Sequence, residues 1–226
     1  MMNKLFLSSG GDIETSYAFD ELFFCALPLK ANILYIPVAM ATTMAKKESC
    51  FDWFSKLISR HSTEERDIDF SMWNNGDTLP NLYDYDALYV GGGNTYRLVS
   101  VLENTGMLRA VKEYIDAGGI YFGGSAGAVI AGKSLRTVEE ENLGNCTDHI
   151  GMDLMRDISV FPHFLDNDEQ RNRIIAINKN NNLKIVALPE GSGLVVGDGT
   201  INVYGNAYVY EHEKKTLIYK SRETLK

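Results

Sequence analysis

The chain has 226 residues, a formal net charge of −8 and 45% hydrophobic residues. This length and apolar content suit an α/β domain with a sizeable core and argue against global disorder, so we expect residues 1–226 to form a single domain. The acidic balance and the scattered Lys and Arg residues argue against nucleic acid or an anionic membrane surface as the main partner.

The apolar runs and the cysteines do not indicate export or membrane insertion. No apolar run approaches 18 residues, so we expect no spanning helix. Met1–Leu7 leads straight into a glycine turn, which is typical of a first strand rather than of a signal peptide. Cys25, Cys50 and Cys146 lack a Cys-x-x-Cys spacing. This argues against a disulfide framework or a zinc site and fits a reducing cytoplasm.

The first half of the chain alternates predicted strands and helices. We expect strands at Lys4–Ser9, Asn32–Val38, Ile68–Trp73, Tyr85–Val90 and Ile120–Phe122. Helices are expected at Glu14–Leu27, Lys46–Arg60, Tyr96–Glu103 and Met107–Asp116. This alternation predicts a parallel sheet covered by helices on both faces, whose strand carboxyl ends form the edge that hosts ligands.

The stretch Gly118–Gly132 carries the clearest functional signal, because it combines a buried strand, a tight turn and a helix of small residues. Ser125 lies at the junction, and its neighbours Gly124, Ala126 and Gly127 are small enough for a crowded elbow. A helix N-terminus there directs N–H groups toward a developing oxyanion. The turn also suits phosphate binding, although it lacks the common phosphate-loop spacings. On this stretch alone, both a nucleophile elbow and an anion-binding turn remain open.

The second half of the chain is less regular. Residues 133–158 are polar and poorly periodic, and we expect short strands and loops there. A strand end at Val160–Phe164 is followed by a predicted helix, Asp168–Asn178, with Ile174 and Ile175 facing inward. Short strands typical of antiparallel hairpins follow at Leu183–Leu188, Gly193–Val196, Ile201–Tyr204, Ala207–Tyr210 and Leu217–Tyr219.

A serine nucleophile needs a base and a third group that orients the base. Of the four histidines, His163 is the strongest candidate, because a Pro and a Phe flank it at a strand end. The alternative is a core histidine satisfied by a backbone partner. His61 is expected to interact with a helix C-terminus, His212 to be solvated in a charged hairpin, and His149 carries no signal.

Five carboxylates are candidates for the orienting acid: Glu139, Glu140, Glu141, Asp166 and Glu190. Glu190 lies between a Pro and a Gly at a strand end, so its backbone is tightly held. The run of three Glu residues also suits simple solvation.

Six short blocks occur in order along the chain: Gly91-Gly92-Gly93-Asn94-Thr95, Gly124-Ser125-Ala126-Gly127-Ala128, Arg136-Thr137, Pro162-His163-Phe164, Glu169-Gln170-Arg171 and Leu188-Pro189-Glu190-Gly191. Together they resemble the peptidase E family of serine peptidases, which includes bacterial aspartyl dipeptidases. The resemblance implies a flavodoxin-like α/β three-layer sandwich related to class I glutamine amidotransferases, with a mostly parallel sheet and C-terminal β-hairpins. It favours the nucleophile elbow over the anion-binding turn.

The resemblance also implies Ser125 as the nucleophile and His163 as the base. It offers two positions for the acid. One is Glu140, where aspartyl dipeptidases typically carry Asp, and the other is Glu190, which we favour. No metal or organic cofactor is expected, because this mechanism needs none and the chain has no His-x-x-x-His spacing.

The remaining family blocks suggest how substrate is held. The oxyanion hole would use the N–H of Ala126 and an N–H from the glycine turn, at Gly92 or Gly93. Asn94 and Thr95 follow that turn and are expected to contact substrate. The implied partner is a short peptide, and the sequence leaves a monomer or a homodimer open.

The chain departs from the aspartyl dipeptidases between Phe164 and Glu169. Those enzymes carry a longer loop there, with an Arg that pairs with the substrate's Asp. This chain has four residues, and Asp168 stands just before the block, while Arg171 aligns with the Arg of the block itself. A carboxylate repels a substrate carboxylate, so we predict hydrolysis of dipeptides without a preference for N-terminal Asp. The alternative is a non-catalytic or anion- or nucleotide-binding module on the same fold.

Overall fold

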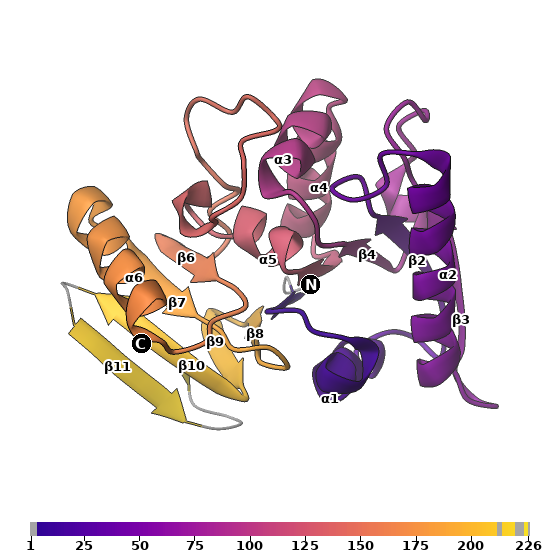
Figure 1. Cartoon of the computed structure of the whole chain (residues 1–226). Coiled ribbons are helices and arrows are strands. Elements are labelled where there is room, and N and C mark those ends of the chain that lie inside the picture. Colours follow the sequence, from indigo (N-terminus) through magenta and orange to yellow (C-terminus); the bar gives the residue numbers. More distant parts are fainter. Residues whose placement is uncertain (1–3, 212–213, 220–223, 226) are drawn as a thin grey trace.

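A central sheet with strand order β12-β9-β8-β1-β5-β4-β2-β3 organises the molecule (Figure 1). The coordinates are a computed structural model that describes residues 4–211, 214–219 and 224–225. Five neighbouring strands are parallel: β1 (Lys4–Ser8), β5 (Ile120–Gly124), β4 (Ala87–Val90), β2 (Lys30–Ile36) and β3 (Asp67–Met72). Three antiparallel strands extend it: β8 (Gly193–Gly197), β9 (Thr200–Tyr204) and β12 (Thr224–Leu225). The predicted mostly parallel α/β sheet is confirmed.

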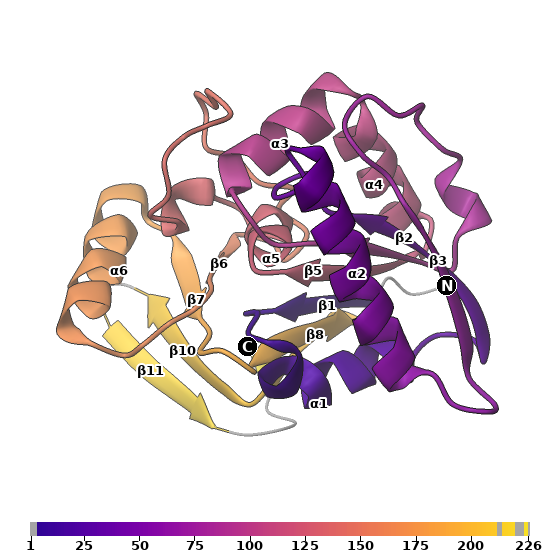
Figure 2. The same ribbon diagram turned by 45° about the vertical axis from the view of Figure 1, so that its right-hand side comes forward.

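Helices cover both faces of this sheet (Figure 2). On one face lie α1 (Ile13–Phe24) and α2 (Met44–His61), and on the other α3 (Thr95–Asn104), α4 (Met107–Asp116) and α5 (Ala126–Ala131). Adjacent strand residues divide between the two cores because side chains alternate along a strand. Phe6, Tyr89 and Phe122 join the core under α1 and α2, whereas Leu88 and Tyr121 join the opposite core.

Several predicted helix boundaries differ from the observed ones, and the first two helices show the physical cause. Helix α1 ends at Phe24 rather than at Leu27, because the N–H groups of Ala26 and Leu27 bond to carbonyls three residues back and close a tighter turn before Pro28. Helix α2 begins at Met44, two residues earlier than predicted, because the Thr43 hydroxyl accepts from a backbone N–H of the first turn at 3.3 Å.

A second, four-stranded sheet has the order β11-β10-β7-β6. It consists of β6 (Ile158–Phe161), β7 (Lys184–Ala187), β10 (Asn206–Glu211) and β11 (Lys214–Tyr219), and α6 (Asp168–Asn181) connects its parallel pair. Ile174 of α6 is fully buried, whereas Ile175 is only partly buried. The C-terminal strands form two antiparallel hairpins in different sheets: β8 and β9 join the central sheet, and β10 and β11 join this one. His212 lies outside the described residues.

Residues 132–157 form a mostly irregular segment, as the sequence indicates. The segment contains the 3₁₀ turn η2 (Leu135–Thr137) and an isolated bridge between Ser134 and Ile150. A further 3₁₀ turn, η1 (Leu82–Asp84), precedes β4. Within the described part of the chain, no helix has the length and apolar content needed to cross a bilayer.

Candidate active site

Ser125 stands on a strained turn between β5 and α5. Its φ of 49° and ψ of −105° are unusual for a residue with a side chain. The Ser125 N–H bonds to the Ser8 carbonyl at 3.0 Å, which fixes the turn to the end of β1. A Cβ at Gly127 would lie 2.4 Å from the Val90 carbonyl oxygen, so only glycine allows α5 to approach β4 this closely. The result is a partly buried serine at the carboxyl edge of the parallel strands, where it lines two cavities.

His163 and Glu190 complete a chain of hydrogen bonds that begins at Ser125. The Ser125 Oγ lies 2.8 Å from His163 Nε2, and His163 Nδ1 lies 2.9 Å from Glu190 Oε1. This arrangement suits the tautomer in which Nδ1–H donates to the carboxylate and Nε2 accepts from the hydroxyl. Both side chains are about half exposed, at 47% and 51%.

The backbones of these two residues are held by bonds to the β1 end. His163 has a φ of 53°, and its N–H donates to Ser9 Oγ at 2.8 Å. That hydroxyl in turn donates to the Leu188 carbonyl at 2.7 Å. Just after Glu190, the N–H of Gly191 bonds to the Gly10 carbonyl at 3.1 Å. Three segments that are far apart in sequence therefore meet at one point.

Glu140 lies near Ser125 and His163, but it lines a different cavity from the one next to Asp20. It lines a cavity of about 180 Å³ together with Thr95, Ser125, His163 and Gln170. The neighbouring Glu139 pairs with Arg173 at 2.9 Å. Of the two acids that the sequence leaves open, the structure joins Glu190 to the imidazole, and Glu140 remains on the cavity wall.

The predicted oxyanion residues surround Ser125. A Cβ added at Gly92 would lie 3.3 Å from the Ser125 Cβ and 3.8 Å from its Oγ, so the glycine leaves this space free. Gly93 has a φ of 125°, and a Cβ there would lie 2.8 Å from the Ala39 carbonyl carbon. Ala126 is the first residue of α5, where a backbone N–H has no partner within the helix.

Two predicted substrate contacts, Asp168 and Arg171, are not brought to Ser125. Arg171 pairs with Asp166 at 2.7 Å and with Asp168 at 2.9 Å, and neither Asp168 nor Arg171 lines the cavities next to the nucleophile. Asp168 and Arg171 lie on the first turn of α6, where an acidic residue such as Asp168 stabilises the helix N-terminus, and Asp166 lies in the loop before it.

Asn94 and Thr95, also predicted to contact substrate, take different positions. The Asn94 side chain caps α3 by accepting from the Arg97 N–H at 2.9 Å and donates to the Glu141 carbonyl at 2.8 Å, so its amide is already used. Thr95 lines the smaller cavity, and its buried hydroxyl has no hydrogen-bond partner.

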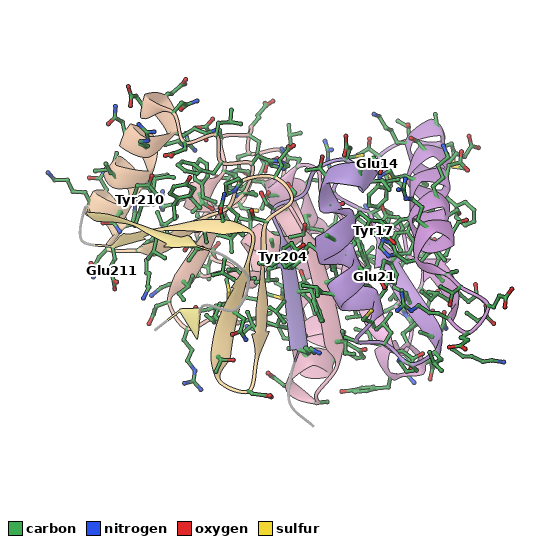
Figure 3. The ribbon with its side chains drawn as sticks, turned by 90° about the horizontal axis from the view of Figure 1, so that it is seen from below. Glu14, Tyr17, Glu21, Tyr204, Tyr210 and Glu211 are labelled. Carbon is green, nitrogen blue, oxygen red and sulfur yellow. The ribbon has the colours of Figure 1, made fainter. Side chains whose placement is uncertain are left out.

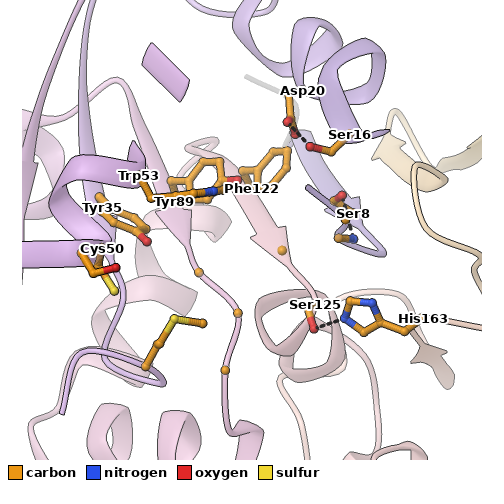
Figure 4. A pocket seen from close by; sticks show the side chains of 18 residues that line it. Ser8, Ser16, Asp20, Tyr35, Cys50, Trp53, Tyr89, Phe122, Ser125 and His163 are labelled. Atoms are coloured by element: carbon orange, nitrogen blue, oxygen red, sulfur yellow. Dashed lines mark hydrogen bonds between the residues drawn. The ribbon is translucent and has the colours of Figure 1, made fainter. Parts of the chain in front are cut away.

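A larger cavity of about 350 Å³ runs from Ser125 to the core under α1 and α2 (Figure 4). Its mouth includes exposed Met40 and Ser49, and its walls are aromatic. The aromatic lining residues are Tyr35, Trp53, Tyr89 and Phe122. Tyr89 stacks on Phe122 with ring centroids 4.3 Å apart.

One charged side chain, Asp20 of α1, lines this cavity. Asp20 is 2% exposed, and its Oδ2 accepts from the Ser16 hydroxyl at 2.7 Å. Its Oδ1 has no hydrogen-bond partner among the described residues. Burial raises the pKa of Asp20 to about 6 despite the bond from Ser16.

The sequence does hold a signal for Asp20. Asp20 lies four residues after Ser16 and three before Phe23, on the face of α1 that packs against the sheet. A carboxylate at a core position of an amphipathic helix is rare and marks a candidate site.

Within the described ranges, no group of three or more His, Cys, Asp or Glu side chains is arranged to hold a cation.

With this geometry in place, comparison with known proteins identifies the family. A model of peptidase family S51 matches residues 5–204, so the chain belongs to that family and is a peptidase. It is 30% identical over 185 residues to a peptidase E of Streptomyces coelicolor, an alignment that covers 77% of this chain and 72% of the relative.

Two further relatives extend over more of the chain. A peptidase E of Shewanella denitrificans is 26% identical over 226 residues, covering 92% of this chain and 90% of the relative. The crystal structure of a peptidase from an acI-B1 actinobacterium superimposes with a TM-score of 0.71 at 18% identity, covering 100% of this chain and 97% of that one. This structural likeness confirms the fold.

Proposed function

We propose that the chain is a serine peptidase that hydrolyses short peptides, above all dipeptides, through an acyl-enzyme on Ser125 and without a preference for N-terminal Asp. The observation that carries this proposal is the pair of hydrogen bonds at 2.8 and 2.9 Å that link Ser125 to His163 and His163 to Glu190. Nucleophile, base and orienting acid are then all within reach of one another.

In the proposed reaction, Ser125 Oγ attacks the scissile carbonyl while His163 Nε2 takes its proton. The imidazolium is stabilised by Glu190 and then gives this proton to the leaving amine. Water, activated by the same imidazole, releases the acyl group. The N–H groups of Ala126 and Gly92 are the donors that we assign to the oxyanion, because both adjoin the nucleophile.

The cavity supports the proposed substrate range. Its volume of about 350 Å³ has room for one or two side chains rather than for a long peptide. Among its described lining residues none is Lys or Arg, and one is the buried Asp20. An acidic acyl residue would therefore meet a like charge and no cation.

The first test is hydrolysis by the Ser125→Ala variant. The substitution removes one hydroxyl at the surface of the turn, so the fold should persist while kcat/KM for dipeptides falls about 10³-fold or more. Turnover equal to that of the unmodified protein would end the serine mechanism.

A second measurement tests specificity alone, by comparing kcat/KM for Asp-Leu with that for Leu-Leu and Met-Leu. We expect Asp-Leu to be no better than the neutral peptides. A clear preference for Asp-Leu, about tenfold or 1.4 kcal/mol, would contradict the specificity and leave the serine mechanism standing.

A further inference from the structure

We propose that Asp20 is the specificity-determining residue of this site and that the large cavity receives the side chain of a lysine that contributes the acyl group. The proposal rests on the proposed peptidase function, since it gives the substrate class of that same site. Among the described residues that line the cavity, Asp20 is the only charged side chain.

Among the described residues, the one side chain that bonds to the Asp20 carboxylate is the neutral Ser16, which does not compensate its charge. Asp20 is 2% exposed, no ion pair involving it occurs in the described part of the chain, and one of its two oxygens is unpartnered. A buried carboxylate without a cation is costly, and proteins keep such groups chiefly where they act on a ligand. Burial also raises its pKa to about 6, which is the signature of a charge that lacks compensation.

The surroundings of Asp20 suit an unbranched cationic side chain. Stacked Tyr89 and Phe122 lie beside Asp20 on the cavity wall, as Figure 4 shows, and Trp53 adds a third aromatic ring to the lining. Aromatic walls favour the methylene stem of lysine and attract its ammonium group through their faces. Ser125 lines the same cavity, so a residue acylating Ser125 can extend its side chain toward Asp20.

The state of the two carboxylate oxygens favours lysine over arginine. Oδ2 already accepts a hydrogen bond from Ser16, which leaves Oδ1 as the free acceptor. A guanidinium pairs best with two free oxygens, whereas an ammonium group acts as a compact point charge and needs only one. We therefore expect Lys-Leu to be a better substrate than Arg-Leu.

The test compares Lys-Leu with norleucine-Leu, whose acyl side chain lacks the charge. At pH 8 the protein should hydrolyse Lys-Leu with a kcat/KM about tenfold higher or more, and Asp20→Asn should remove that advantage while changing norleucine-Leu about threefold or less. Asp116→Asn, an exposed carboxylate at the end of α4, is the matched control and should keep the preference.

Two outcomes in hydrolysis would overturn the proposal. Equal kcat/KM for Lys-Leu and norleucine-Leu by the unmodified protein would do so without any variant, even if Asp20→Asn fails to fold. A charge preference seen for Leu-Lys and not for Lys-Leu would place the cation on the leaving residue instead.

A binding titration separates this proposal from the peptidase function. Lysinamide and norleucinamide share an α-amine and differ in the side-chain charge. The protein should bind lysinamide about tenfold more tightly, and Asp20→Asn should abolish the difference. If neither peptide is hydrolysed but this difference holds, the peptidase function fails and the cation site stands. If Asp20→Asn weakens both amides equally, Asp20 binds the α-amine and the side-chain assignment is wrong.

Discussion

The described residues contain two histidine–carboxylate pairs, and they differ in what the second ring nitrogen meets. His163 lies 2.9 Å from Glu190 and its second nitrogen meets the Ser125 hydroxyl. His61 lies 2.6 Å from Glu21, and its second nitrogen is buried without a partner. A histidine and a carboxylate in contact therefore do not define an active site. A hydroxyl on the remaining nitrogen and an open cavity in front of it are also needed.

The surroundings of His61 explain why that pair is structural. The imidazole is fully buried and stacks against Tyr17 and Phe24, with ring centroids 4.7 and 4.4 Å away. Burial lowers the pKa of His61 although Glu21 opposes this, so the ring is neutral near pH 7. Partial burial raises the pKa of Glu21, but hydrogen bonds from His61 and Arg66 outweigh it and bring that pKa to about 2. Tyr17 and Glu21 lie along the same side of α1, as Figure 3 shows.

Replacing each histidine with alanine should give the largest difference between the two pairs. His163→Ala should lower kcat/KM about 10³-fold or more with little change in stability, because the ring is half exposed. His61→Ala should leave kcat/KM within about threefold but lower the free energy of unfolding by about 2–4 kcal/mol, because it empties a packed site. Peptide hydrolysis and urea denaturation of both variants measure the two effects. Loss of activity in His61→Ala together with unchanged activity in His163→Ala would contradict this assignment.

Charge removal at the two candidate acids sharpens the comparison. Glu190→Gln should lower kcat/KM about 10²- to 10⁴-fold, since a neutral amide no longer stabilises the imidazolium. Glu140→Gln, on the wall of the smaller cavity, should change it about threefold or less. The opposite pattern in steady-state kinetics would assign the orienting role to Glu140.

Asp20 extends the comparison to a buried carboxylate with no cation. Its carboxyl binds a proton more tightly in the folded state, with a pKa of about 6 against an ordinary 3.8. The protonated Asp20 carboxyl therefore contributes its full stability to the folded state below about pH 4, and this contribution is lost as the pH rises through about 6. Relative to Asp20→Asn, the unmodified protein should lose about 2–3 kcal/mol of unfolding free energy between pH 4 and pH 8.

Urea denaturation at several pH values measures this loss, with Asp116→Asn as the control that should parallel the unmodified protein. Parallel curves for Asp20→Asn and the unmodified protein would show that Asp20 is not desolvated.

Local patterns in the sequence were sufficient for the elbow and most elements of the fold. The glycines around Ser125 are required by close backbone approach, so the strand–turn–helix elbow could be predicted from them. The preference for a nucleophile over an anion-binding turn came instead from the family blocks. The sequence favoured Glu190 over Glu140 but could not show that Glu190 contacts His163, because that contact depends on the bonds between the Leu188–Gly191 turn and the β1 end, which are far apart in sequence. The second sheet was not predicted, because the pairing of β7 with β10 joins segments whose local patterns do not specify a partner.

The central claim is that Ser125 is a nucleophile activated by His163, and covalent labelling tests it most directly. Incubation with a fluorophosphonate, followed by intact-mass and peptide mass spectrometry, should show one adduct per chain, located on Ser125. The rate should fall strongly in His163→Ala and stay near that of the unmodified protein in His61→Ala. Absence of an adduct on Ser125, or an equal labelling rate in His163→Ala, would contradict the account.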